Sequence, residues 1–117
     1  IESLISRESL LTSIMNAGMY GNISVKKEAC WCICNAMADA IASQKKVLVE
    51  HGAIEVLAGM LKPEHNIRLS DLQVILEGID HILQVYGGAG STNPYADMFE
   101  ELGGLDDLER IQADENL

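Results

Sequence analysis

Apolar residues recur along the chain with the spacing of helices and are separated by turn residues. The clearest run lies in residues 72–83, where apolar positions follow the i, i+3, i+4, i+7 spacing of one helix face. They are Leu72, Ile75, Leu76, Ile79, Ile82 and Leu83. No segment shows the alternation with period two that a half-buried strand needs. The pattern therefore predicts an all-α chain.

Turn residues divide this pattern into helices of different lengths. Gly18 and Gly21 are expected to end the first helix, and Ser24 is expected to cap the second. Asn93 followed by Pro94 is typical of an N-cap and a first helical position. We expect helices near residues 10–15, 24–39, 44–50, 53–61, 72–83, 94–102 and 105–111.

The order of these helices repeats. A short helix, a glycine, a medium helix and a long helix occur over residues 43–86, and the same order begins again at residue 93. When the long helices are aligned, Trp31 matches Leu76 and Asn35 matches Asp80, each pair 45 residues apart. This period is in the range of three-helix armadillo and HEAT repeats. Such repeats bury their apolar faces against their neighbours and stack into a superhelix.

We therefore expect an all-α armadillo-repeat right-handed superhelix, an α-solenoid, of about two and a half repeats. The expected divisions are residues 1–40, a repeat with an incomplete first helix, and residues 41–90, a repeat with a Gly-rich insertion at 87–91. Residues 91–117 would start the final repeat with two helices.

The ends of the chain carry a further expectation. The chain begins with Ile1 rather than Met, so we expect it to belong to a longer protein. Its last repeat would stop after two helices, at Leu117. Without a third helix, apolar surface from residues 105–111 would stay uncovered, so we expect a dimer or partial disorder there.

Charge is divided unevenly along the chain, whose net charge is −10. Residues 1–63 carry six acidic and six basic side chains, whereas residues 64–117 carry twelve acidic side chains against only Arg68 and Arg110. An acidic field of this kind argues against a nucleic-acid partner and favours a basic one. No stretch is long and apolar enough to span a bilayer, so we expect no membrane partner.

Cysteine and histidine are not spaced like ligands of a metal. Cys30, Cys32 and Cys34 lie two apart, so on a helix Cys32 faces away from the other two. There is no CxxC pair, and the three histidines are scattered. We interpret the cysteines as small packing residues in a reducing compartment and expect no metal or cofactor.

No motif of an enzyme occurs either. The stretch GGAGS at residues 87–91 is rich in glycine but follows a helix rather than a strand, so it lacks the context of a phosphate loop. No nucleophile elbow and no pair of catalytic carboxylates is present, and we expect no enzymatic activity.

The only tryptophan lies in the stretch KKEACWCICN, residues 26–35. On a helical wheel of about 100° per residue, Glu28, Trp31 and Asn35 share one narrow face. Ile33 and Met37 fall on the opposite side, which would pack into the core. The wheel thus favours an indole that faces a groove. A core tryptophan, with the asparagine satisfying a neighbouring turn, remains the alternative.

The side chains on this face suit an extended basic peptide. A carboxamide carries a donor and an acceptor, so Asn35 could bond both the N–H and the C=O of a peptide backbone. The Trp31 indole could take the methylene stem of a Lys or Arg and attract its cation, worth about 0.5–2 kcal/mol. Glu28 could pair with the cationic head. Because each contribution is small, useful affinity requires several repeats.

Longer stretches resemble a known family. KKEACWCICNAMADA followed by VLVEHGAIEVLAGML resembles the armadillo repeats of importin α, where a third helix reading KEAxWxxxN precedes a short helix, a glycine and a medium helix. ILEGIDHILQV resembles the penultimate repeat of that family, and FEELGGLDDLERIQADENL resembles the last one. The resemblance covers essentially the whole chain, in order.

The resemblance implies a function. Importin α is an adaptor that holds basic nuclear localisation signals extended along a concave groove lined by Trp and Asn. A chain similar to its C-terminal repeats would hold the end of the minor site, with Glu28, Trp31 and Asn35 as carboxylate partner, aromatic shelf and backbone clamp. It would act in a protein that shuttles between cytoplasm and nucleus and meets importin β through its full length.

The next repeat departs from the motif, since Gln73, Leu76 and Asp80 occupy the Glu, Trp and Asn positions. We still expect Gln73 and Asp80 to line the peptide groove, on a polar stripe that also includes Glu77 and Gln84. In the family, acidic C-terminal repeats also contact the export receptor, a role that we assign to Glu77 and Asp71. The alternative function is a generic armadillo scaffold that assembles other proteins.

Overall fold

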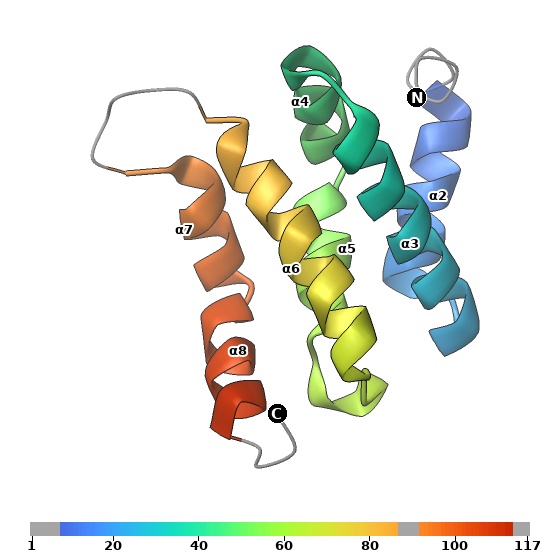
Figure 1. Cartoon of the computed structure of the whole chain (residues 1–117). Coiled ribbons are helices and arrows are strands. Elements are labelled where there is room, and N and C mark those ends of the chain that lie inside the picture. Colours follow the sequence, from blue (N-terminus) through green and yellow to red (C-terminus); the bar gives the residue numbers. More distant parts are fainter. Residues whose placement is uncertain (1–7, 87–91, 114–117) are drawn as a thin grey trace.

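The computed structural model describes residues 8–86 and 92–113, and these residues are helical apart from short connections (Figure 1). The predicted all-α class is confirmed for these ranges. The elements are α2 (Glu8–Tyr20), α3 (Ile23–Asp39), α4 (Ala42–Glu50), α5 (Ala53–Met60), the 3-10 turn η1 (Pro63–His65), α6 (Leu69–Gln84), α7 (Pro94–Glu101) and α8 (Gly104–Ala113).

Two predicted helix ends are wrong for local reasons. Asn22, not Ser24, caps α3, because its side-chain Oδ1 accepts a hydrogen bond from the Val25 N–H at 3.0 Å. Gly18 does not end the first helix but lies inside α2, where a Cβ would be 2.7 Å from Cγ1 of Val56. This glycine is therefore a point of close helix contact rather than a stop signal.

The other predicted boundaries agree with the structure to within a few residues. Gly52 and Gly103 have positive φ angles, 115° and 82°, which favour glycine because a Cβ would be strained there. Asn93 caps α7 by accepting from the Tyr95 N–H at 2.9 Å, and Pro94 begins that helix. The Asn93 side chain also donates to the carbonyl of Leu83 at 2.8 Å, which ties the start of α7 to the end of α6.

The two long helices, α3 and α6, lie side by side, and α5 packs against both of them from behind (Figure 1). Helix α2 packs against α3 and α5, and α7 packs against α5 and α6. One continuous aliphatic core runs through the stack, with Met37, Leu57 and Ile82 fully buried. Each layer thus buries its apolar face against the next, as a solenoid requires. The predicted repeat limits at residues 40 and 90 stay a prediction.

The contact between the long helices depends on Gly78 of α6. A Cβ at this position would lie 2.7 Å from Cδ2 of Leu57 and 2.9 Å from Sγ of Cys34. Because real Cβ atoms do not come so close to other heavy atoms, only glycine lets α6 approach both α5 and α3 at this distance. The separation of α3 and α6, and hence the surface between them, is set here.

We expect Gly78→Ala to lower the free energy of unfolding by about 1–3 kcal/mol, because the new methyl group overpacks a close helix contact. Gly59→Ala is the matched control, since a Cβ there meets nothing within 4 Å and alanine favours the helix by about 0.5–1 kcal/mol. Urea unfolding of both variants measures the difference. Equal effects of the two substitutions would contradict the assigned contact.

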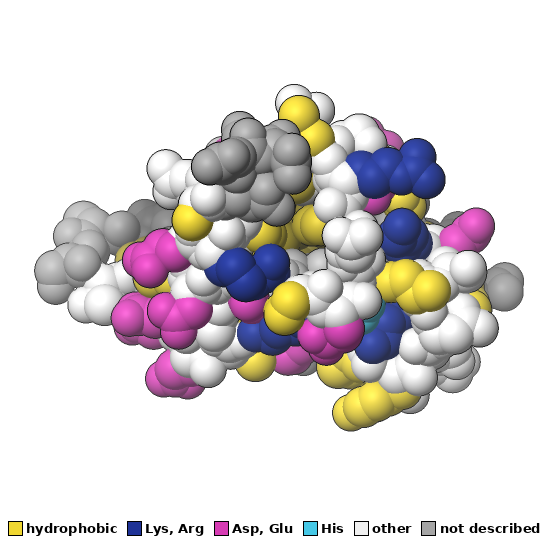
Figure 2. All heavy atoms as spheres, turned by 90° about the horizontal axis from the view of Figure 1, so that it is seen from below, with side chains coloured by type: hydrophobic (Ala, Val, Ile, Leu, Met, Phe, Trp, Pro, Cys, Tyr) yellow, Lys and Arg dark blue, Asp and Glu magenta, His cyan; other side chains and the backbone are white. Residues whose placement is uncertain are grey.

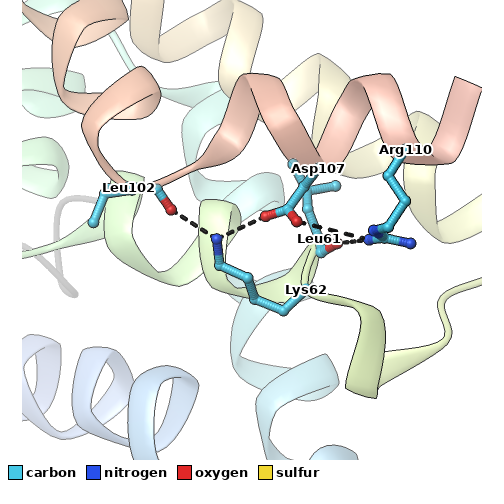
Figure 3. A network of polar contacts seen from close by, with 5 residues as sticks. All are labelled: Leu61, Lys62, Leu102, Asp107 and Arg110. Atoms are coloured by element: carbon cyan, nitrogen blue, oxygen red, sulfur yellow. Dashed lines mark hydrogen bonds and ion pairs between the residues drawn. The ribbon is translucent and has the colours of Figure 1, made fainter.

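A polar network joins the end of α5 to the corner between α7 and α8 (Figure 3). The Lys62 ammonium donates to the carbonyl of Leu102 at 2.7 Å and pairs with Oδ2 of the buried Asp107 at 2.7 Å. Nη2 of Arg110 donates to the carbonyl of Leu61 at 2.6 Å and lies 3.9 Å from Oδ1 of Asp107. These contacts fix the last two helices on the preceding ones.

Replacing Lys62 by Met keeps the aliphatic stem but leaves the carboxylate of Asp107 without its closest partner. We expect Lys62→Met to lower the free energy of unfolding by about 1–3 kcal/mol, the range for a buried polar group that loses its bond. Lys46→Met, on the exposed face of α4, should change it little. Unfolding midpoints in urea that coincide for the two variants would contradict this role of Lys62.

The expectation of an uncovered apolar surface at residues 105–111 is largely wrong. Ile111 is buried and Leu108 is half-buried against the core, while Leu105 is 45% exposed. The dimer stays a prediction. The Gly-rich insertion at 87–91 and the acidic residues at 114–117 lie outside the described residues. No helix in the described ranges has the length and apolarity to cross a membrane.

Candidate functional site

The face of α3 that carries Trp31 points away from the core. Ile33 and Met37 are buried on the opposite side, at 1% and 0% exposure, whereas Trp31 is 38% exposed. Asn35 and Glu28 are exposed on the same face as Trp31. The orientation expected from the helical wheel is therefore confirmed, and a core position for this tryptophan is excluded.

Two small hollows flank the indole in the surface between α3 and α6. The first is lined mainly by apolar atoms, from Trp31, Cys30, Met60, Val74 and Ile75, with Lys27 and Asp71 beside them. The second also touches Trp31 and adds polar groups, namely Asn35, Glu77 and His81. Trp31 and Val74 thus line both hollows.

The structure brings some of the expected site residues together and leaves others apart. Trp31, Asn35 and Glu77 line one hollow, and Asp71 lines the other. Gln73 and Asp80 are exposed on α6 but line neither hollow, and Glu28 is likewise exposed outside them. The Asp80 carboxylate accepts a hydrogen bond from Gln84 at 2.9 Å, so this part of the polar stripe is bonded internally.

Asp71 is engaged within the chain. Its Oδ2 accepts from the Arg68 N–H at 3.2 Å, which caps α6, and lies 4.0 Å from the Lys27 ammonium of α3. The same carboxylate therefore stabilises the start of α6 and links it to α3. The other acidic group beside Trp31 is that of Glu77, which is exposed and has no hydrogen bond or ion pair with the residues that the structure describes.

His81 also lines the second hollow. The Lys45 ammonium lies 3.2 Å from Nδ1 of His81. Because an ammonium can only donate, Nδ1 of His81 is the acceptor in this contact, which links α4 to α6 beside the hollow.

Comparison with known proteins identifies the kind of chain that carries this surface. No family model matches it. It is 33% identical over 110 residues to importin subunit alpha-5 of Arabidopsis thaliana, a match that covers 89% of this chain and 20% of that protein. It is 37% identical over 79 residues to importin subunit alpha-1b of Oryza sativa subsp. japonica, covering 62% of this chain and 14% of that protein.

The chain is an importin α-like armadillo-repeat region. It spans about a fifth or less of the length of these curated relatives. The helical stack described above is accordingly an armadillo α-solenoid. Both relatives are named as importin subunits and not as enzymes.

Several residues that line these hollows in the importin α-like region were not predicted from the sequence, among them Lys27, Val74 and His81. Val74 and His81 lie on either side of Gly78 along α6, and Lys27 lies one turn before Trp31. The alignment of the long helices could have indicated Val74 and His81, because they lie beside the polar stripe of α6. Their place at the contact with α3 depends on the close approach at Gly78, which periodicity does not reveal.

The three cysteines of the importin α-like region differ in environment. Cys30 and Cys34 are buried one helical turn apart, and Cys32 is exposed on the other side of α3, as the wheel predicted. A hydrogen bond to Cys34, together with burial, raises the pKa of the Cys30 thiol, and the same bond lowers the pKa of Cys34. No group of three or more His, Cys, Asp or Glu side chains within the described ranges is placed to hold a metal ion.

We expect one cysteine to react rapidly with a thiol reagent such as DTNB in the folded protein, because only Cys32 is exposed. Cys30 and Cys34 should react only when the chain unfolds. Cys32→Ser should abolish the fast phase, and Cys34→Ser should leave it intact. A fast phase that persists in Cys32→Ser would contradict the burial of the other two thiols.

Proposed function

We propose that this chain is part of a nuclear-import adaptor and that the groove between α3 and α6 binds basic nuclear localisation signals in an extended form. The observation that carries the proposal is the half-exposed indole of Trp31, placed between two hollows and beside Asn35. The names of the relatives, both importin subunits, support the same function.

The groove offers a separate contact for each part of such a peptide. The methylene stem of a Lys or Arg can lie along the indole, and its cation is attracted by the ring at about 0.5–2 kcal/mol. The Asn35 carboxamide can bond the peptide N–H and C=O, which holds the backbone without reading its sequence. The Glu77 carboxylate lines the same hollow as Trp31 and Asn35 and would pair with the ammonium head.

The remaining predicted peptide-binding residues lie outside the two hollows. Glu28, Gln73 and Asp80 are exposed there, and in this proposal they contact the peptide before and after the Trp31 position. Because each contact is worth little alone, the chain should bind a basic peptide weakly. The complete adaptor, with more repeats and with importin β as its carrier, would shuttle between cytoplasm and nucleus.

The contact with an export receptor is a second part of the proposal. The acidic surface of residues 64–117, with Glu77 and Asp71, would meet a basic surface of that receptor. Glu77 is the more exposed of the two and has no ion pair among the described residues, whereas Asp71 is already paired with Lys27. We therefore assign the larger share of this contact to Glu77.

The groove is tested with a fluorescently labelled Lys/Arg-rich peptide and fluorescence anisotropy. We expect the double variant Trp31→Ala/Asn35→Ala to bind at least about tenfold more weakly, since it loses both the cation–π contact and the backbone clamp. Tyr20→Ala is the matched control, because Tyr20 is an aromatic residue that is 80% exposed on α2, away from the groove. It should bind the peptide as the unmodified chain does.

The alternative is a generic armadillo scaffold, which would have no preference for basic peptides. If the double variant bound the basic peptide with unchanged affinity, the groove between α3 and α6 would not be the binding site. Equal affinity for a peptide with Lys and Arg replaced by Gln would favour the scaffold.

A further inference from the structure

The two basic residues of the acidic half of the chain line the same hollow. Arg68 and Arg110 are the only Lys or Arg residues among 64–117, and both line a small hollow between η1, the start of α6 and the last turn of α8. Lys62 and Asn66 line the same hollow. The Asp107 carboxylate pairs with Lys62 and lies near Arg110, so the three cations together leave a local excess of positive charge in a chain of net charge −10.

The two guanidinium groups differ in what they already bind. The Arg68 side chain has no hydrogen bond or ion pair with any residue in 8–86 or 92–113. Arg110 is held in place, since its Nη2 donates to the Leu61 carbonyl and lies near Asp107. A guanidinium has five N–H donors, so this anchoring leaves donors of Arg110 for a second partner.

Part of the lining is apolar. Pro63 and Ile67 supply most of this surface and the nearly buried Leu72 and Ile111 supply only their edges, whereas Leu61 has no exposed surface. A free inorganic anion would satisfy the cations but would cover none of this apolar surface. The chemistry that matches both parts is a carboxylate next to an apolar side chain, because Arg binds carboxylates with two parallel hydrogen bonds and the apolar surface takes up the apolar group.

The surroundings of the hollow favour a single carboxylate rather than a polyanion. Figure 2 looks at this end of the molecule: Lys and Arg side chains lie in the middle and to the right, and Asp and Glu side chains gather at the left, with a few also in the middle and at the right. A nucleic acid that ran across this face would meet those acidic side chains. A short peptide that places one carboxylate in the hollow would not.

We propose that this hollow is a second peptide site, which binds an acidic segment of a protein partner in which Asp or Glu adjoins Leu, Ile or Phe. It shares no lining residue with either hollow beside Trp31, so a basic peptide and an acidic peptide can be bound at the same time. The chain would then bind peptides of opposite charge at two sites: basic cargo in the groove between α3 and α6, and an acidic partner in the hollow lined by Arg68 and Arg110.

The test uses the blocked peptide acetyl-Gly-Leu-Glu-Leu-Gly-amide and NMR chemical-shift titration of the ¹⁵N-labelled chain. The amides of Asn66, Arg68, Arg110 and Ile111 should shift together and saturably, while those of Trp31 and Asn35 should not. Arg68→Gln should weaken binding about three- to tenfold, because it loses one charge-assisted contact. Lys46→Gln, an exposed cation on α4, should leave binding unchanged.

Three results would overturn the proposal. The same peptide with Gln in place of Glu could bind equally well, which would remove the carboxylate from the interaction. Inorganic phosphate could shift the same amides at equal or lower concentration, which would make the hollow a simple anion site. Arg68→Gln could bind as the unmodified chain does while keeping its urea midpoint, which would show that the shifts arise elsewhere.

Discussion

The close approach of α6 to α3 and α5 at Gly78 is the constraint on which the candidate groove depends. With a hydrogen as its side chain, Gly78 lets the α6 backbone approach the Cys34 sulfur and the Leu57 side chain closer than any other residue allows. The small Cys34 belongs to the same contact. Trp31, on the face of α3 that points away from the core, lines the two small hollows beside this contact.

Polar contacts then determine how the remaining helices are added. The short α7 and α8 bury few apolar side chains, among them Phe99 and Ile111. They are held also by Lys62, which caps the carbonyl end of α7 and pairs with Asp107 of α8. The same corner brings Arg110 next to the start of α6. An interaction that holds the stack together thus also creates the cationic hollow at its edge.

The periodicity of apolar residues was sufficient to predict the helices, their order and the outward face of α3. It was insufficient where a residue acts through a neighbour that is distant in the sequence. Gly18 was taken as a helix end because a glycine weakens a helix, yet it lies inside α2 because Val56 packs against it. Likewise, the sequence placed Trp31, Asn35 and Glu28 on one face and Glu77 on the polar stripe of α6, but it could not show that His81 of α6 completes the hollow beside Trp31. Nor could charge counting show that Arg68 and Arg110 meet.

The most direct test of the central claim uses the intrinsic fluorescence of the chain, because Trp31 is its only tryptophan. Emission is recorded while a Lys/Arg-rich peptide is added, with its Gln-substituted counterpart as the reference. If the groove holds the basic peptide against the indole, the emission will change saturably and move towards shorter wavelengths as the peptide covers the ring, and the counterpart will have no effect. If anisotropy shows that the basic peptide binds but the emission of Trp31 does not change, the peptide does not lie against the indole and the central claim is contradicted.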